Sequence, residues 1–191
     1  MAKQTWKPGN MLYPVPAVMV SCRRPGEKAN IITIAWAGTV CSDPPMVSIS
    51  VRRERRSYDI IKESGEFVLN LGTKDLVRSA DYCGVRSGRD VDKFRECRLH
   101  ELPSKEVAAP GIAESPVNIE CRVTEIKPLG SHDLFLAKVV SVTIDDRYLD
   151  EKGKFDLNRA GLAAYSHGEY FELGRKMGSF GFSVRKKKGN R

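Results

Sequence analysis

The sequence of 191 residues has no hydrophobic run long enough to cross a membrane. A transmembrane helix needs about 20 consecutive apolar residues. The apolar stretch 11–20 is interrupted by Pro14 and Pro16, and two arginines follow it in place of a small-residue cleavage site. The sequence therefore predicts neither a membrane span nor a signal peptide, and we expect a cytoplasmic protein.

The sequence also lacks the cysteine and histidine spacings of disulfide-bonded domains and of zinc sites. The five cysteines are odd in number and widely spaced, and no two of them form a CxxC motif. Disulfide frameworks and zinc sites both leave such patterns. His167 and Glu169 lie two residues apart, but no third ligand is near them. We expect reduced thiols and no metal site.

Two common nucleotide-binding motifs are absent. The sequence has neither GxGxxG nor GxxxxGK[ST], which form the phosphate-binding turns of Rossmann domains and P-loop proteins. No internal repeat is present. A dinucleotide-binding Rossmann unit and a P-loop are therefore unsupported.

Positive charge is concentrated at the end of the sequence. The formal net charge is +8, and five of the positive charges belong to Arg185, Lys186, Lys187, Lys188 and Arg191. The remaining +3 is unexceptional for a domain. We expect one domain over residues 1–184, followed by a solvated basic tail at 185–191.

The rest of the sequence favours β-strands with a few short helices. Strands are expected at 13–21, 31–40, 66–71, 117–126 and 134–144, with the first two forming a hairpin. Helices are expected at 58–63, 74–82, 90–97 and 157–162, and a loop at 101–116. Because the helices do not alternate strictly with strands, the pattern predicts a mainly β fold, a barrel with inserted helices.

Residues 30–52 are the most informative stretch. They indicate a strand at 31–37 and another at 46–51, joined by a hydroxyl-rich connection. Gly38 in this connection permits close approach of a ligand to the backbone, and cationic residues follow the second strand. The combination is typical of a site for a flat, phosphorylated ligand.

Four segments together resemble the flavin reductase-like family, and its flavoredoxin branch most closely. They are 36–52, 57–58, 87–94 and 130–135. The resemblance extends from about residue 10 to about residue 182. It implies an FMN-binding split β-barrel and a homodimer with the flavin near the subunit interface.

A phosphate group is best held by hydroxyls, cations and the free amides at a helix start. Ser57 is a candidate N-cap for the helix that ends before Gly65, and Arg52 precedes it by five residues. The family pattern adds Lys93 and Ser87. Alternatively, Ser57 only caps its helix, and Arg52 and Lys93 are solvated surface charges.

The flavin ring needs an apolar face and donors for its pyrimidine oxygens. The run 37–41 begins with Ala37 and offers the backbone amides of Gly38, Thr39 and Val40. These amides would oppose the negative charge that develops near N1 and the C2 carbonyl on reduction.

Three further residues have two interpretations each. Trp36 either fills the core or contacts the cofactor, and the resemblance favours the contact. Tyr165 lies in a segment that closes over the flavin in the family, or it packs in the core. Asn30 is a cofactor contact or a turn residue.

The resemblance also places Cys41 and His132 at the open face of the ring. His132 would border the nicotinamide or acceptor pocket and contribute polarity and proton delivery. Alternatively, Cys41 is a small buried hydrophobe and His132 is a loop imidazole.

These features predict an FMN-dependent oxidoreductase. NAD(P)H or a reduced protein would load the flavin, and a flavin, a metal ion or an electron-transfer partner would unload it. One alternative is a nucleic-acid-binding barrel, motivated by the arginines at 52–56 and the basic tail but lacking a stacking platform of aromatic residues. Another is a flavin-binding protein without catalysis.

Overall fold

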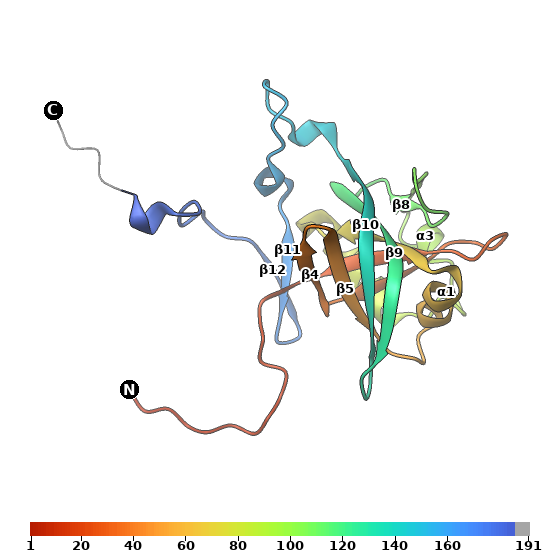
Figure 1. Cartoon of the computed structure of the whole chain (residues 1–191), viewed down its shortest axis with the longest axis horizontal. Coiled ribbons are helices and arrows are strands. Elements are labelled where there is room, and N and C mark those ends of the chain that lie inside the picture. The colour runs from red at the N-terminus through yellow and green to blue at the C-terminus, as the bar shows by residue number, and fades with distance from the viewer. Residues whose placement is uncertain (186–191) are drawn as a thin grey trace.

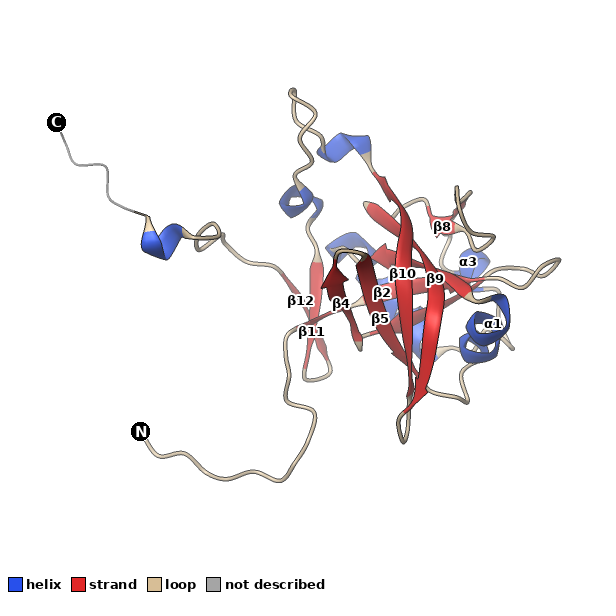
Figure 2. Cartoon of the chain, viewed as in Figure 1, coloured by secondary structure: helices blue, strands red, loops and turns tan. Residues whose placement is uncertain are grey.

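The computed structural model describes residues 1–185, and its main element is a curled antiparallel sheet of seven strands (Figures 1 and 2). In spatial order the strands are β3 (Asn30–Ile34), β2 (Val18–Cys22), β6 (Glu66–Leu71), β9 (Val117–Pro128), β10 (Asp133–Ile144), β5 (Pro45–Val51) and β4 (Ala37–Ser42). The predicted mainly β fold with inserted helices is confirmed. Residues 186–191, most of the predicted basic tail, lie outside the described residues.

The curled sheet forms a split barrel. Its two edge strands, β3 and β4, are neighbours in sequence but lie at opposite ends of the strand order. The backbone N–H of Ser50 in β5 donates to the carbonyl of Trp36, just after β3, at 2.9 Å. Within residues 1–185, β3 itself pairs with neither β4 nor β5. The barrel is therefore closed at one point and split along β3.

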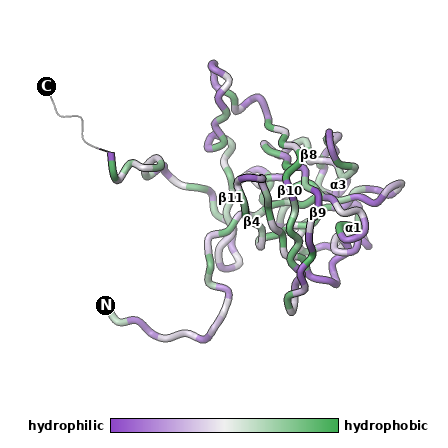
Figure 3. The backbone as a smooth tube through the Cα atoms, in the orientation of Figure 1, coloured by the Kyte–Doolittle hydropathy of each residue, from purple (hydrophilic) through white to green (hydrophobic). Residues whose placement is uncertain are grey.

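The barrel core consists of inward-facing side chains from every wall. Val20, Ile49, Phe67 and Phe135 are fully buried. Inward residues alternate with outward ones along the strands, as the two-residue period of a strand requires. Figure 3 shows hydrophobic stretches in the strands and hydrophilic stretches in the outer loops.

Three α-helices and a 3₁₀ helix accompany the sheet. They are α1 (Arg56–Ser64), η1 (Lys74–Leu76), α2 (Val77–Val85) and α3 (Lys93–Glu96). Ile60 and Ile61 of α1 are buried in the barrel core. The helices α2 and α3 cover the other side of β2 and β3 through a second cluster that contains Ile31, Ala80 and Phe94. No described helix is long and apolar enough to span a membrane.

Smaller elements complete the fold. A three-stranded sheet contains β1 (Val15–Pro16), β11 (Ala163–Ser166) and β12 (Glu169–Glu172), and a two-stranded sheet contains β7 (Glu101–Leu102) and β8 (Gly111–Ile112). Single 3₁₀ turns lie at η2 (Asp146–Tyr148), η3 (Leu157–Ala160) and η4 (Phe182–Val184). Both terminal segments run away from the barrel (Figure 1).

Most predicted elements are confirmed with shifted bounds. The hairpin forms from β2 and β3, and β6, β9 and β10 correspond to the other predicted strands. The four predicted helices correspond to α1, to η1 with α2, to α3 and to η3. The predicted loop 101–116 contains β7 and β8.

The segment after Trp36 differs from its prediction. Residues 38–42, expected partly as the end of a strand 31–40 and partly as a connection, join Ala37 in β4, which pairs with β5 alone. The register shifts between Thr39 and Cys41, so β4 carries a bulge. Gly38 is a poor strand former, and an edge strand tolerates it because only one side is paired.

The start of β10 is held by a buried carboxylate. Asp133 is 3% exposed and accepts hydrogen bonds from Arg53 Nη2 at 2.8 Å and from the Tyr58 hydroxyl at 2.8 Å. The bonds from Arg53 are the main reason that the pKa of Asp133 lies below its usual value. This pair ties the end of β5 and the helix α1 to β10.

We expect Gly65→Ala to lower the free energy of unfolding by roughly 1–2 kcal/mol. Gly65 ends α1 with φ 70°, a backbone conformation that costs other residues energy, while its amide donates to the Ile61 carbonyl. Urea unfolding followed by circular dichroism measures the change. Gly174→Ala is the matched control, because no atom lies within 4 Å of either added methyl group and Gly174 has no positive φ. Equal stabilities of the two variants would contradict this role of Gly65.

A pH-dependent loss of stability should follow from Asp133. Since folding lowers its pKa, its contribution to stability is present above the unfolded pKa of about 3.9 and is lost as the pH falls through the lower folded value. Asp133→Asn should be less stable than the native chain at pH 7 and should lose less stability on acidification. Urea unfolding between pH 7 and pH 2.5 tests this, and parallel curves for the two proteins would refute it.

Candidate functional site

A cavity of about 170 Å³ opens where α1 begins, between β3, the end of α2 and the loop before α3. Its cationic lining residues are Arg55, Arg56, Arg86, Arg89 and Lys93, and Glu54 is the one carboxylate among the described lining residues. We call this space the cationic cavity. Its charge balance favours an anionic ligand with more than one negative charge.

The N-terminus of α1 adds to this positive potential. Arg55 occupies the N-cap position, and no described side chain caps the first amides of the helix. Uncapped amides at a helix start carry a positive partial charge and bind anions. Neither Arg55 nor Arg86 forms an ion pair within residues 1–185.

The prediction of Ser57 as the N-cap is wrong. The backbone of Arg55 is the last extended position, so the helix begins at Arg56 and Ser57 lies in its first turn. The Ser57 hydroxyl is buried and accepts a hydrogen bond from Asn30 Nδ2 at 2.7 Å. Both side chains line the cationic cavity, and Asn30 is the first residue of β3, not a turn residue.

Gly88 allows the loop before α3 to pack against Asn30. A Cβ atom added at Gly88 would lie 1.8 Å from Asn30 Oδ1, which is far inside any allowed contact. The same loop is held by Arg56, whose Nη1 donates to the Gly88 carbonyl at 2.6 Å, and by Ser87, whose hydroxyl accepts from the Arg89 amide at 3.1 Å. Ser87 also lines the cavity, and its contact with a cofactor stays a prediction.

Lys93 is a buried cation, not a solvated one. It is 4% exposed, and its Nζ donates to the carbonyls of Ile31 at 2.6 Å and Cys83 at 2.7 Å. Burial lowers the pKa of its ammonium group. An ammonium group has three donors, so one N–H remains for a ligand in the cationic cavity.

Arg52 lies outside the cationic cavity. It is exposed, pairs loosely with Glu54 at 3.7 Å, and lines the neighbouring space between β3 and β5. Arg55 and Arg86, which do line the cavity, were missed because their positions depend on where α1 begins and α2 ends. The group of four arginines within residues 52–56 was the sequence feature that could have indicated Arg55. Arg53 of this cluster is bound to Asp133.

The split of the barrel forms a second cavity. It has a volume of about 140 Å³ and lies between residues 32–36 and Ser50, Val51 and Arg52. Ile32 and Arg55 line both this split cavity and the cationic cavity, so the two are adjacent. His132 also lines the split cavity.

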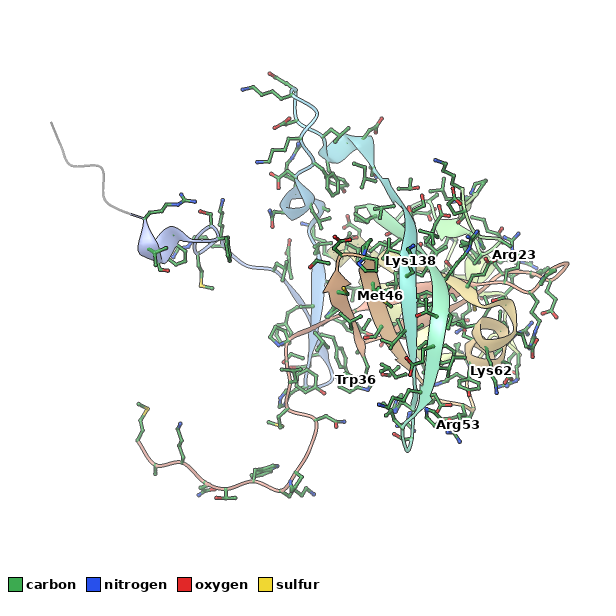
Figure 4. All side chains as sticks on the ribbon, viewed as in Figure 1. Arg23, Trp36, Met46, Arg53, Lys62 and Lys138 are labelled. Atoms are coloured by element: carbon green, nitrogen blue, oxygen red, sulfur yellow. The ribbon has the colours of Figure 1, made fainter. Side chains whose placement is uncertain are left out.

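An aromatic cavity of about 340 Å³ adjoins the split cavity on the side of the small sheet. The Tyr13 ring lies 6.0 Å from the Trp36 ring and 6.3 Å from the Tyr165 ring, centre to centre. Trp36 is located at the edge of the barrel near the N-terminal segment (Figure 4). Cationic, split and aromatic cavities thus follow the β3 edge in a row, an arrangement that fits a flat ligand with an anionic tail.

The amides of Gly38, Thr39 and Val40 do not form the expected set of three donors. These residues are exposed on β4, where alternate amides bond to β5. Only those amides of β4 that point away from β5 are free to bind a ligand. Ala37 at the start of β4 is half-buried against the barrel core.

Cys41 and His132 do not form a pair within one chain. Cys41 is opposite Met46, whereas His132 precedes Asp133, which is opposite Val51. Five residues of strand separate Met46 from Val51, about 17 Å. Figure 4 shows Met46 and Arg53 at the two ends of this ladder. Cys41 bonds locally, with its thiol 3.3 Å from the Asp43 carbonyl.

His132 is a half-buried imidazole beside the split. Its Nδ1 lies 2.8 Å from the Ser131 hydroxyl. Burial, together with the nearby Arg52 cation, lowers the pKa of His132 below its usual value near 6.5. The imidazole is therefore mostly neutral at pH 7, and can both accept and donate a proton.

A family model described as "Flavin reductase like domain" matches residues 10–174. The chain belongs to the flavin reductase-like family. A protein of Archaeoglobus fulgidus is 32% identical over 145 residues, which cover 76% of this chain and 81% of the relative.

Solved structures show the same fold. Flavoredoxin of Desulfovibrio vulgaris (Miyazaki F) is 28% identical with a TM-score of 0.88, covering 96% of this chain and 100% of that one. Flavoredoxin from Methanosarcina acetivorans is 27% identical with a TM-score of 0.85 and the same coverage. The resemblance to the flavoredoxin branch is thereby confirmed, as is the split barrel.

We expect Gly88→Ala to destabilise the chain by about 1–3 kcal/mol, the range for overpacked positions. The added methyl group must displace Asn30 and with it the bond to Ser57. Gly84→Ala is the matched control in the same cavity, because its methyl group would meet Thr33 at an ordinary 3.4 Å and alanine favours the helix α2. Urea unfolding measures both. A Gly88→Ala chain as stable as Gly84→Ala would contradict the close packing.

Proposed function

We propose that the chain is an FMN-dependent oxidoreductase that holds the cofactor along the β3 edge. The observation that carries the proposal is the cationic cavity at the uncapped start of α1, adjacent to the split and aromatic cavities. FMN has the matching parts, a phosphate mostly dianionic at neutral pH and a flat ring. When bound, it supplies hydride and single-electron chemistry.

The phosphate would lie in the cationic cavity. Arg55 and Arg86 offer guanidinium groups that form no ion pair within residues 1–185, Lys93 offers its third N–H, and the first amides of α1 offer their dipoles. The Asn30–Ser57 pair gives this space a fixed polar wall. Arg52 would act farther along the cofactor, because it lines the split cavity.

The ring would lie toward Trp36 and Tyr165, whose side chains offer apolar surface. The outward amides of β4 would oppose negative charge on the pyrimidine edge. His132, neutral and half-buried, would hold or transfer a proton at the ring's open side. Cys41 is too far from His132 to share one ring face with it, so we propose that a Cys41 contact comes from a second copy of the chain.

A wider cavity of about 550 Å³ gives access to this region. Met11, Leu12, Trp36, Leu129 and His132 are among its lining residues. We propose that the electron donor, NAD(P)H or a reduced protein, and the acceptor, a flavin, a metal ion or an electron-transfer partner, use this opening. The reaction would take place in the cytoplasm.

We also propose a homodimer. The segments that leave the barrel expose Leu12 (86%), Met177 (94%), Phe180 (104%) and Val184 (83%), which is unusual for apolar side chains in water. A second copy would cover them. Sedimentation should give about twice the chain mass of 21.3 kDa, and a monomer at micromolar concentration would refute this part.

Removing the unpaired arginines should weaken FMN binding selectively. Arg55→Ala with Arg86→Ala should raise the Kd for FMN at least tenfold, since each lost charge-assisted hydrogen bond is worth about 1.5–3 kcal/mol. The Kd for riboflavin, which lacks the phosphate, should stay constant. Flavin fluorescence quenching measures both, and Arg78→Ala, an exposed arginine of α2 outside the cavity, is the control.

The Kd for riboflavin shows whether the two arginines bind the phosphate or support the fold. An equal loss of affinity for both ligands would mean that the arginines support the fold and do not bind phosphate. A native chain that binds neither flavin would refute the proposed cofactor.

Reduction of the bound flavin tests catalysis. NADH or NADPH added anaerobically to the FMN-loaded chain should bleach the flavin absorption, and an added acceptor should restore it. His132→Gln should slow bleaching and flatten its dependence on pH between 5 and 8. Flavin binding without bleaching by either nucleotide, and without exchange with a reduced protein, would identify a non-catalytic flavin-binding protein.

A further inference from the structure

Two of the five free cysteines are in contact, and one of them, Cys83, lines the cationic cavity. The Sγ atoms of Cys83 in α2 and Cys97 just after α3 lie 3.9 Å apart. The other three do not share this arrangement, because Cys22 and Cys121 lie in the barrel core and Cys41 lies on β4. A single cysteine in a core is ordinary packing, whereas two sulfurs in contact at a helix–helix junction can react with each other.

The two thiols differ in access. Cys97 is partly exposed at the edge of the second core cluster, and we expect a small oxidant to reach its sulfur before that of Cys83. Cys83 is buried, and burial raises its pKa to about 12, so it keeps its proton. Formation of a disulfide needs the sulfurs to close from 3.9 Å to about 2.05 Å, a shift of the size that side-chain rotation provides.

We propose that Cys83 and Cys97 form a redox-active dithiol that hydrogen peroxide converts to an intramolecular disulfide. In the first step the Cys97 sulfur attacks one peroxide oxygen, the O–O bond breaks, and a sulfenic acid and water form. In the second step the Cys83 sulfur gives up its proton and attacks the Cys97 sulfur, the S–S bond forms, the S–O bond of the sulfenic acid breaks, and its hydroxyl takes the proton and leaves as a second water. Two thiols are oxidised by two electrons and one peroxide is reduced to two waters.

The disulfide would act on the cationic cavity. Cys83 lines this cavity, and its carbonyl accepts the Lys93 ammonium. The chain between the two sulfurs contains Ser87, Gly88 and Lys93, which form the side of the cavity opposite α1. A bond across the ends of this segment would restrict its opening. This consequence rests on the proposed function, and it predicts slower release of FMN from the oxidised chain.

Peroxide treatment of the full chain tests the dithiol without any flavin. One equivalent of hydrogen peroxide should remove two of the five thiols that react after denaturation. Non-reducing peptide mass spectrometry should find Cys83 and Cys97 joined, lighter by two hydrogen atoms, and a dithiol reductant should reverse both changes. Cys41→Ser is the control, because it removes a different partly exposed cysteine. This variant should still form the disulfide between Cys83 and Cys97.

Cys97→Ser should lose this response completely. If peroxide instead oxidises Cys41 first, or joins two chains, or leaves Cys83 and Cys97 reduced, the proposed dithiol is refuted. Thermal unfolding of Cys97→Ser in the reduced state checks that the variant folds, and Cys83→Ala gives a second variant that removes the bond from its other side.

Release of FMN tests the coupling to the cavity. The oxidised native chain should release FMN severalfold more slowly than the reduced chain, with reversal by dithiol and no change in Cys97→Ser. A disulfide that leaves the release rate unchanged refutes the coupling alone. A chain that forms the disulfide but binds no FMN in either state refutes the proposed cofactor and leaves the dithiol established.

Discussion

The geometry of the site depends on one constraint, the way in which the barrel closes. Strands β3 and β4 follow each other in sequence but form the two edges of the sheet, so the chain must cross from one edge to the other within a few residues. The hydrogen bond from the Ser50 amide to the Trp36 carbonyl fixes this crossing. Because β3 has no partner on its outer side, its edge is left for the cavities, and the start of α1 is brought beside Asn30.

The charges around this edge divide into two groups with different roles. Arg53 is committed to Asp133 and Arg56 to the Gly88 carbonyl, so these two arginines hold the fold together. Arg55 and Arg86 have no such partners within the described residues, and Lys93 is buried against carbonyls alone. Burial of an ammonium group without a carboxylate is unfavourable. An anion in the cationic cavity offsets that cost, which is why this cluster indicates a ligand site more strongly than the net charge does.

The strands with regular alternation could be predicted from the sequence, because their period is local. Residues 66–71 form β6 with the predicted bounds. The full extent of strand β4 could not be predicted, because Gly38 is a poor strand former and the segment forms a strand where β5 is beside it. Gly65 was identified correctly as a helix end, whereas the predicted N-cap Ser57 lies two residues after the observed one, Arg55, because serine is a preferred N-cap residue and arginine is not. The Asn30–Gly88 packing joins positions 58 residues apart. A contact between residues so far apart in the sequence cannot be predicted from local sequence patterns.

The two walls of the cationic cavity differ in how firmly their backbones are paired. The walls formed by β2, β3 and β6 are paired in continuous antiparallel ladders, and their backbone groups open only with the barrel. The opposite wall, from Cys83 to Cys97, consists of the end of α2, a loop and the four-residue helix α3. Its contacts with the rest of the fold come from Lys93 and Phe94, from the Arg56–Gly88 bond and from the Arg89 bond to the Glu54 carbonyl, and none of them is part of a strand ladder. Segments of this kind open at lower free energy than the strands they cover. Opening of the cationic cavity therefore costs less free energy along this wall than along the strands, and the proposed disulfide would join the two ends of the wall.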